Sequence, residues 1–204
     1  QGGTDGQRFA RSSDFAGAGA PGIVGPGCYV RRMILPTETE ESRFWAMLED
    51  AWASLGPGPN EVRRALAKRD VTEDAFEEAA ELEEHLPSVL RALAAASADL
   101  SAEELTALDR VAERKLYEID RADLQEVTDG SDDGFLYARG FVLALGREFY
   151  EAVARDSRVA VVDAECEEFC YFFAHLHDAR FGGFPETGSG ISRESVSNPA
   201  GWPR

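Results

Sequence analysis

The chain has 204 residues, 44% hydrophobic and 29% charged, a composition typical of a globular protein with room for one domain and a core. Its formal net charge of −17 argues against nucleic acid and anionic membranes as partners, because affinity for phosphate groups rests on Lys and Arg. No apolar run approaches the ~20 residues that span a bilayer, and no secretory pattern opens the chain, so we expect a cytoplasmic protein.

Residues 1–35 differ from the rest of the chain in composition and charge. Residues 1–27 are rich in Gly, Ala and Ser without apolar periodicity, which predicts a disordered or loop-like segment. Residues 28–35 could form a short strand, and Met33 raises the alternative that the natural chain begins there. We expect residues 1–35 to be an N-terminal extension, with the first 32 dispensable for folding.

Amphipathic segments with short connections follow as far as residue 119, which predicts helix after helix. The first ends at Gly56–Pro59, and Pro87 ends or kinks the third. The expected N-caps are, in chain order, Thr37 or Thr39, Asn60, Thr72 and Ser101, the last within a capping-box pattern.

The densest acidic run lies near the start of the third predicted helix. It contains Glu73, Asp74, Glu77, Glu78, Glu81, Glu83 and Glu84. A cation site or a docking surface for a basic partner is one interpretation, but the spacing lacks the alternating ligands and turn glycine of an EF-hand loop. We favour a solvated helix face.

The most apolar segment begins at Ser131, a good N-cap that is followed by Asp132 and Asp133 in the first turn, where the helix dipole favours negative charge. Apolar residues then recur at helical spacing, which predicts one long central helix over residues 131–155, the most buried of the fold. Gly140 and Gly146 each cost roughly 1 kcal/mol relative to Ala in a helix interior, so we expect another helix to pack close to the backbone there.

Residues 158–162 predict a brief strand or a buried linker, and residues 164–181 return to helical spacing. Cys166 and Cys170 share one helix face, whereas His175 and His177 point to different sides, so the four side chains cannot converge on a zinc ion and we expect buried thiols instead. The tail, 186–204, is expected to be irregular, and its last part, residues 195–204, to lie over the surface with Trp202 as its one docked residue.

Three segments in the same order resemble an uncharacterised bacterial family, the domain of unknown function 4240. Residues 131–150, with the sequence SDDGFLYARGFVLALGREFY, resemble the family signature. Residues 43–51 resemble its opening Phe-Trp helix, and residues 167–171 followed by 180–182 resemble its closing helix. Between Lys115 and Val127 the chain lacks the tryptophans that the family tends to carry. The resemblance implies a fold and no particular reaction.

These features together predict a single all-α domain, a compact helical bundle with at most one short strand or hairpin and loop-like ends. The helical domain is expected to span residues 36–185, between the extension at 1–35 and the tail at 186–204.

A candidate site can be assembled from polar and aromatic residues around the central helix, since the chain has no phosphate-binding glycine loop, nucleophile elbow or zinc-protease helix. Its members are Asp132, Asp133, Arg139, Trp45 and Tyr137. We favour helix capping as the role of Asp132 and Asp133. If one of them is instead buried and paired with an arginine, such as Arg139 or one from the first helix, we expect it to be Asp133, with Asp132 the more exposed of the two carboxylates. No metal or cofactor is expected.

Two functions remain open. The first is a non-catalytic module that binds another protein, with a basic surface, in an accessory, regulatory or immunity-like role. The alternative is an enzyme that acts on a peptide or small metabolite through Asp132 and Asp133, which requires an environment that separates their two pKa values. A deep pocket lined by the candidate cluster would favour the enzyme, and an exposed acidic or apolar patch would favour the binding module.

Overall fold

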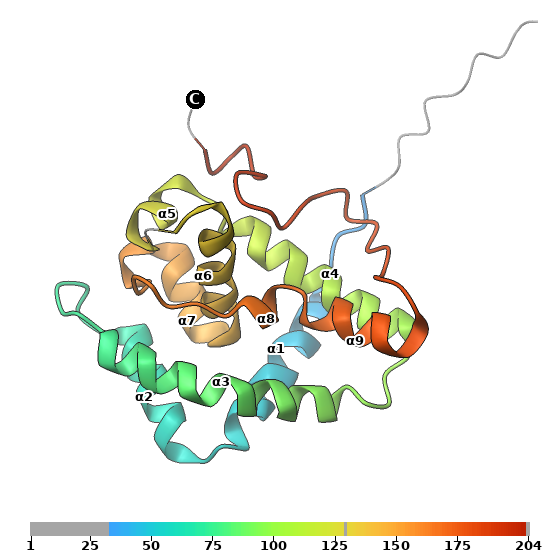
Figure 1. The fold of residues 1–204 in the computed structure, drawn as a ribbon, viewed down its shortest axis with the longest axis horizontal. Coiled ribbons are helices and arrows are strands. Elements are labelled where there is room, and N and C mark those ends of the chain that lie inside the picture. Colours follow the sequence, from blue (N-terminus) through green and yellow to red (C-terminus); the bar gives the residue numbers. More distant parts are fainter. Residues whose placement is uncertain (1–32, 129, 203–204) are drawn as a thin grey trace, which may run out of the picture. The chain divides into compact units, whose positions relative to one another are not determined.

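Nine α-helices account for most of residues 33–128 and 130–202, the residues that the computed structural model describes. They are α1 (Glu38–Ala53), α2 (Pro57–Lys68), α3 (Phe76–Ala96), α4 (Ala102–Glu118), α5 (Ala122–Thr128), α6 (Asp132–Ala144), α7 (Arg147–Arg155), α8 (Glu167–Cys170) and α9 (Phe172–Phe181) (Figure 1). Because no β-strand occurs in these two ranges, the prediction of an all-α fold is confirmed. The loop-like segment and most of the strand predicted before residue 36 lie outside the described residues.

Local side-chain caps begin the helices where the sequence predicts them most clearly. Thr37 forms a capping box with Glu40, and Ser101 forms one with Glu104. In each box the hydroxyl accepts from the backbone N–H of the glutamate, and the glutamate carboxylate accepts from the backbone N–H of the capping residue. At α6 the Ser131 hydroxyl accepts from the Gly134 N–H at 3.2 Å. These three N-caps are confirmed.

The second and third helices differ from the prediction at their ends. α2 begins at Pro57, and Asn60 lies inside it and donates to the carbonyls of Trp52 and Gly56, so Asn60 secures the end of α1 and is not an N-cap. α3 continues through Pro87, because the buried side chains on both sides of the proline hold the helix against the core.

The predicted long helix over 131–155 is wrong, because the chain breaks between α6 and α7 at Gly146. Its φ of +90° is in the left-handed region, which a helix cannot contain. The side chains of Arg63 and Glu49 take over the backbone groups that the break leaves free. Arg63 Nη1 donates to the Leu145 carbonyl at 2.8 Å, and Glu49 Oε1 accepts from the Arg147 N–H at 3.2 Å.

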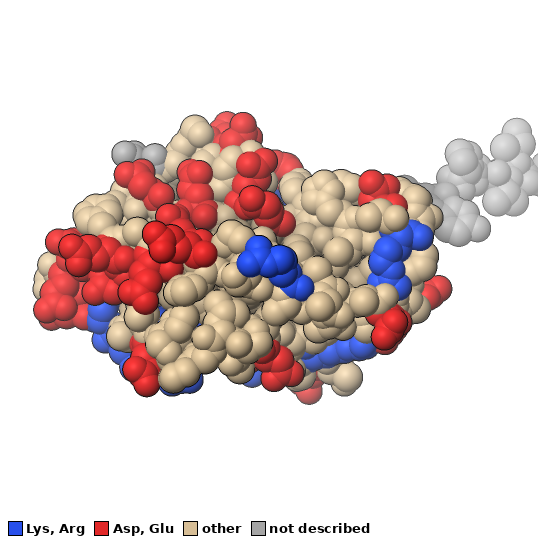
Figure 2. Space-filling model, turned by 60° about the horizontal axis from the view of Figure 1, so that its bottom comes forward, with Lys and Arg blue, Asp and Glu red and all other residues tan. Residues whose placement is uncertain are grey.

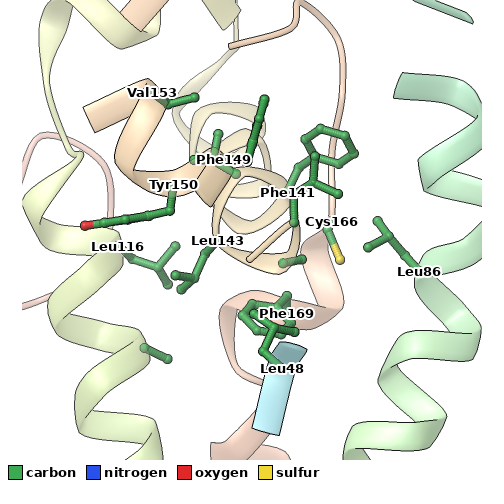
Figure 3. Packing of buried hydrophobic residues seen from close by; sticks show 14 of the residues in the cluster. Leu48, Leu86, Leu116, Phe141, Leu143, Phe149, Tyr150, Val153, Cys166 and Phe169 are labelled. Atoms are coloured by element: carbon green, nitrogen blue, oxygen red, sulfur yellow. The ribbon is translucent and has the colours of Figure 1, made fainter. Parts of the chain in front are cut away.

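α6 lies at the centre of the described residues, in contact with α4, α5, α7 and α8. Nine of its 13 residues are buried. Figure 3 shows Phe141 and Leu143 of this helix among Leu48 of α1, Leu116 of α4 and Phe169 of α8. The predicted close approach at Gly140 is confirmed, since a Cβ atom there would lie 2.4 Å from the Cys166 carbonyl oxygen at the start of α8.

The chain after α7 forms the buried linker that was one of the two predicted alternatives. A short 3-10 helix (Ser157–Val159) leads into Ala160 and Val161. Val159, Ala160 and Val161 are buried, and none of them is part of a β-strand. Arg69 of the α2–α3 connection donates to the carbonyls of Val159 and Ala160, which ties this linker to α2.

The C-terminal strap, which we define as residues 187–202, is irregular but firmly docked. It returns from α9 to the start of α5, where the Ala122 N–H donates to the Gly201 carbonyl at 3.0 Å (Figure 1). Trp202 is docked as predicted. It is not the only docked residue, because three polar strap residues are buried, and the expectation that residues 195–204 lie over the surface is wrong at Asn198. The three buried residues are Ser189, Arg193 and Asn198.

Candidate functional site

The structure separates the five residues of the predicted site. Asp133 and Tyr137 line one groove, whereas Asp132 is exposed outside it. Trp45 belongs to the core and packs its ring against Phe44 and Tyr150, with ring centroids 5.0 and 5.4 Å apart. The predicted five-residue cluster is therefore not brought together.

Arg139 is completely buried and does not pair with Asp133, which is exposed, so the predicted pair is wrong. The two residues are six positions apart on α6 and point to different sides of the helix. Arg139 instead donates to the Leu116 carbonyl at 2.9 Å and to the Ser195 hydroxyl at 3.1 Å. Burial lowers the pKa of its guanidinium. Arg139 is a structural link between α4, α6 and the strap.

Substituting Asp132 or Asp133 by Asn is expected to cost no more than ~1 kcal/mol of stability, because both are exposed and serve only the helix terminus. Urea unfolding of the two variants at constant m-value measures this. A loss of ~3 kcal/mol at either position would instead indicate that the carboxylate pairs with a buried charge, contrary to its exposure in the structure.

The larger feature around Asp133 is a groove of about 590 Å³ that we call the α6–α9 groove. It lies between α6, α8, α9 and the strap. Its lining residues are Asp133, Leu136, Tyr137, Glu167, Glu168, Tyr171, Phe172, His175, Leu176 and Glu194. The groove therefore uses residues that are up to 61 positions apart in the chain.

The groove is acidic at its edges and apolar in its floor. Four of its lining residues are carboxylates, all exposed, and none is Lys or Arg. The floor is formed by Leu136, which is buried, and by the half-buried Phe172 and Leu176. A cation that enters the groove would meet negative charge on α6, on α8 and on the strap without a competing positive side chain among the lining residues.

Two tyrosines, Tyr137 and Tyr171, line the groove next to its carboxylates. Desolvation raises the pKa of Tyr137, and the nearby Glu167 and Asp133 carboxylates raise it further. Desolvation likewise raises the pKa of Tyr171, whose hydroxyl donates a hydrogen bond to Glu194. Both hydroxyls therefore stay protonated near neutral pH and can donate hydrogen bonds. The two aromatic rings add apolar surface to the groove.

An exposed aromatic side chain extends the groove outward. Phe184 is 53% exposed, and its ring lies 6.2 Å from that of Tyr171 and 5.1 Å from that of His175. A large apolar ring kept in water next to an apolar floor is a feature of surfaces that bind other proteins.

The cysteines next to the groove offer no nucleophile. Cys166 and Cys170 are buried, as predicted, and desolvation raises the pKa of each thiol to about 12. Cys170 Sγ lies 3.4 Å from the Leu136 carbonyl oxygen, to which it donates. Within residues 33–128 and 130–202, no group of three or more His, Cys, Asp or Glu side chains is arranged to hold a metal ion. No helix in these ranges is both long and apolar enough to cross a bilayer.

The acidic run of α3 is a separate surface. Six of its seven carboxylate residues are exposed, as expected of a solvated helix face, whereas Glu83 is half-buried and accepts from the Glu165 N–H at 2.9 Å. Figure 2 shows Asp and Glu side chains gathered at one end of the face in view, where Lys and Arg are few. This run lies outside the α6–α9 groove.

The sequence alone did not indicate Glu167, Glu168, His175 or Glu194 as site residues. The first three are spaced so that α8 and α9 can present them on one side, but the same pattern suits any half-exposed helix. Glu194 reaches the groove only because the strap folds back, which no local pattern signals.

Residues 74–174 match the model of a family described as "Protein of unknown function (DUF4240)". The predicted family resemblance is thereby confirmed. The match includes the segment at 131–150 and seven of the ten groove residues, whereas His175, Leu176 and Glu194 lie outside it. The Phe-Trp segment at 43–51 also lies outside. No curated protein and no solved structure matches the chain.

Proposed function

We propose that this protein is a non-catalytic module that binds a basic, partly apolar segment of another protein in the α6–α9 groove. The observation that carries the proposal is the combination of four exposed carboxylates with an aromatic and aliphatic floor and no lining Lys or Arg. Apolar side chains of the partner would gain about 25 cal/mol per Å² of buried surface on this floor.

The negative charge of the chain favours a basic partner. The chain carries a formal net charge of −17, so a second copy would be repelled, whereas a basic segment would be attracted over a distance of about one Debye length. Within the groove, Lys or Arg side chains can pair with Glu167, Glu168 or Asp133 while their aliphatic stems lie over Tyr137 and Phe172.

The alternative is an enzyme for a peptide or small metabolite. It is supported by the size of the groove, which falls within the roughly 300–1,000 Å³ of small-molecule sites, and by Asp133 and His175 in its lining. It is weakened by the position of Asp132 outside the groove, because the two carboxylates cannot then act together as acid and base on one substrate.

The test is binding of a synthetic amphipathic helical peptide of Leu and Lys, about four helical turns long, measured by fluorescence anisotropy. Replacing Glu167 and Glu168 together by Lys is expected to weaken binding at least about tenfold, or 1.4 kcal/mol, because it reverses the charge on one wall of the groove. Affinity for the unaltered protein should fall as salt is raised.

The matched control replaces Glu77 and Glu81 by Lys, since both are exposed on α3 and outside the groove. This pair changes the net charge by the same amount and is expected to weaken binding less than about threefold, through long-range attraction alone. Equal weakening by the two pairs would show that the peptide responds to overall charge, and the groove would lose its assigned role.

A further inference from the structure

One wall of the α6–α9 groove belongs to the C-terminal strap, and the two strap residues next to it are held by buried groups. Glu194 lines the groove and accepts a hydrogen bond from the Tyr171 hydroxyl. Before it, Arg193 donates to both Asp109 oxygens, at 3.1 and 2.9 Å, and to the Cys170 carbonyl at 2.7 Å.

On its other side, Ser195 connects the strap to the start of α6. Its hydroxyl donates to the Asp132 carbonyl at 2.5 Å and accepts from Arg139 Nη2 at 3.1 Å. Asp132 precedes Asp133, which lines the groove from α6. A shift of the strap at this point would therefore move Glu194 relative to the α6 side of the groove.

Beyond Ser195, a single buried carboxylate organises the strap. Asp120 is 0% exposed and accepts from the backbone N–H groups of Val196, Ser197 and Asn198 at 3.0, 2.7 and 2.8 Å. The Trp202 indole N–H donates to it as well, at 3.1 Å. Four donors on one carboxylate form a cage that closes the strap onto the end of α4.

Val196 shows that the cage determines the backbone there. Its φ is +62°, a conformation that β-branched residues rarely adopt, and its side chain is 56% exposed, so burial does not compensate for the strain. Such a conformation persists only while surrounding contacts enforce it. Here three successive backbone N–H groups donate hydrogen bonds to the Asp120 carboxylate. Without the charge of Asp120, the strap should relax near Ser195.

We infer that docking of the strap regulates the α6–α9 groove, with Asp120 as a positioning residue that acts through Glu194 and Ser195 without lining the groove itself. The inference rests on the proposed function. Because the strap supplies one wall, partner binding and strap docking stabilise each other, and the coupling is reciprocal. An undocked strap would leave Tyr171 without its Glu194 acceptor and the groove without that wall.

The experiment compares the full-length protein with its Asp120→Asn variant in binding the same Leu and Lys peptide. Asn keeps the size of the side chain but removes the charge and half of its acceptor capacity. We expect the affinity to fall about tenfold, although no residue of the groove is changed. The control is Asn60→Ala, which replaces a buried polar residue of α2 that bonds the end of α1 and no residue of the strap, and which is expected to leave the affinity unchanged.

Hydrogen exchange supplies a second measurement that does not depend on the variant. Saturating peptide is expected to slow exchange of the amides of residues 194–198 in the unaltered protein. If Asp120→Asn does not fold, hydrogen exchange and the peptide affinity of the milder Ser195→Ala variant test the coupling between strap and groove. Unchanged affinity in a folded Asp120→Asn protein, or unchanged exchange at 194–198, overturns the coupling while the binding function stands. Absence of binding to the unaltered protein overturns both.

Discussion

Replacing Asp109 by Asn is expected to lower the free energy of unfolding by about 3 kcal/mol. Asp109 is 2% exposed and forms a two-point ion pair with Arg193, which is 5% exposed, so the substitution would leave a buried guanidinium without its main partner. Loss of one partner of a buried pair typically costs about 3–5 kcal/mol. We place this loss at the lower end because Glu113 lies 3.7 Å from the same guanidinium and retains part of the attraction.

Urea unfolding at constant m-value measures the loss. The control is Glu148→Gln, which removes one member of the exposed pair with Lys68, whose side chains are 48% and 67% exposed. Exposed pairs contribute about 0–1 kcal/mol, so this variant should remain close to the unaltered protein. Similar losses for the two variants would show that the Asp109–Arg193 pair is far better hydrated than its burial indicates.

The parts of the fold that depend on neighbouring residues could be predicted from the sequence. The caps at Thr37, Ser101 and Ser131 involve partners three residues away, and the apolar spacing of the helices reports which face is buried. The close approach at Gly140 was predictable too, since a glycine inside an apolar helix indicates a nearby backbone.

The break at Gly146 cannot be predicted by the same reasoning. The apolar spacing continues through it, so a helical glycine and a left-handed one look alike in the sequence. The difference lies in Arg63 and Glu49, 83 and 97 positions earlier, which bind the backbone groups that the break exposes. A local pattern contains no information about such partners.

The candidate site was partly found for a related reason. Asp133 and Tyr137 lie one turn apart on α6, and both line the groove. Arg139 is a member of the predicted cluster because it lies about two turns further along the same helix. The structure instead places buried carboxylates on α4 and at its end, where Asp109 and Asp120 hold the strap. Sequence separation of 76 residues or more between these partners hid them.

Replacing Gly140 by Ala is expected to destabilise the protein by about 2 kcal/mol. In an open helix the same change would stabilise by up to about 1 kcal/mol, because Ala has the higher helix propensity. Here the added Cβ would lie 2.4 Å from the Cys166 carbonyl oxygen and 2.7 Å from Cys170 Sγ. The carbonyl oxygen is a backbone atom that no side-chain rotation can remove, so α8 must move, and overpacking of this kind costs about 1–3 kcal/mol.

Gly58→Ala is the matched control for Gly140→Ala, since Gly58 lies in α2 and a Cβ atom there would have no neighbour within 4 Å. It is expected to leave the stability unchanged or to raise it by up to about 1 kcal/mol. Urea unfolding of both variants gives the sign of each change. A stabilising Gly140→Ala substitution would contradict the tight packing of α6 against α8, on which the position of Glu167 and Glu168 in the groove depends.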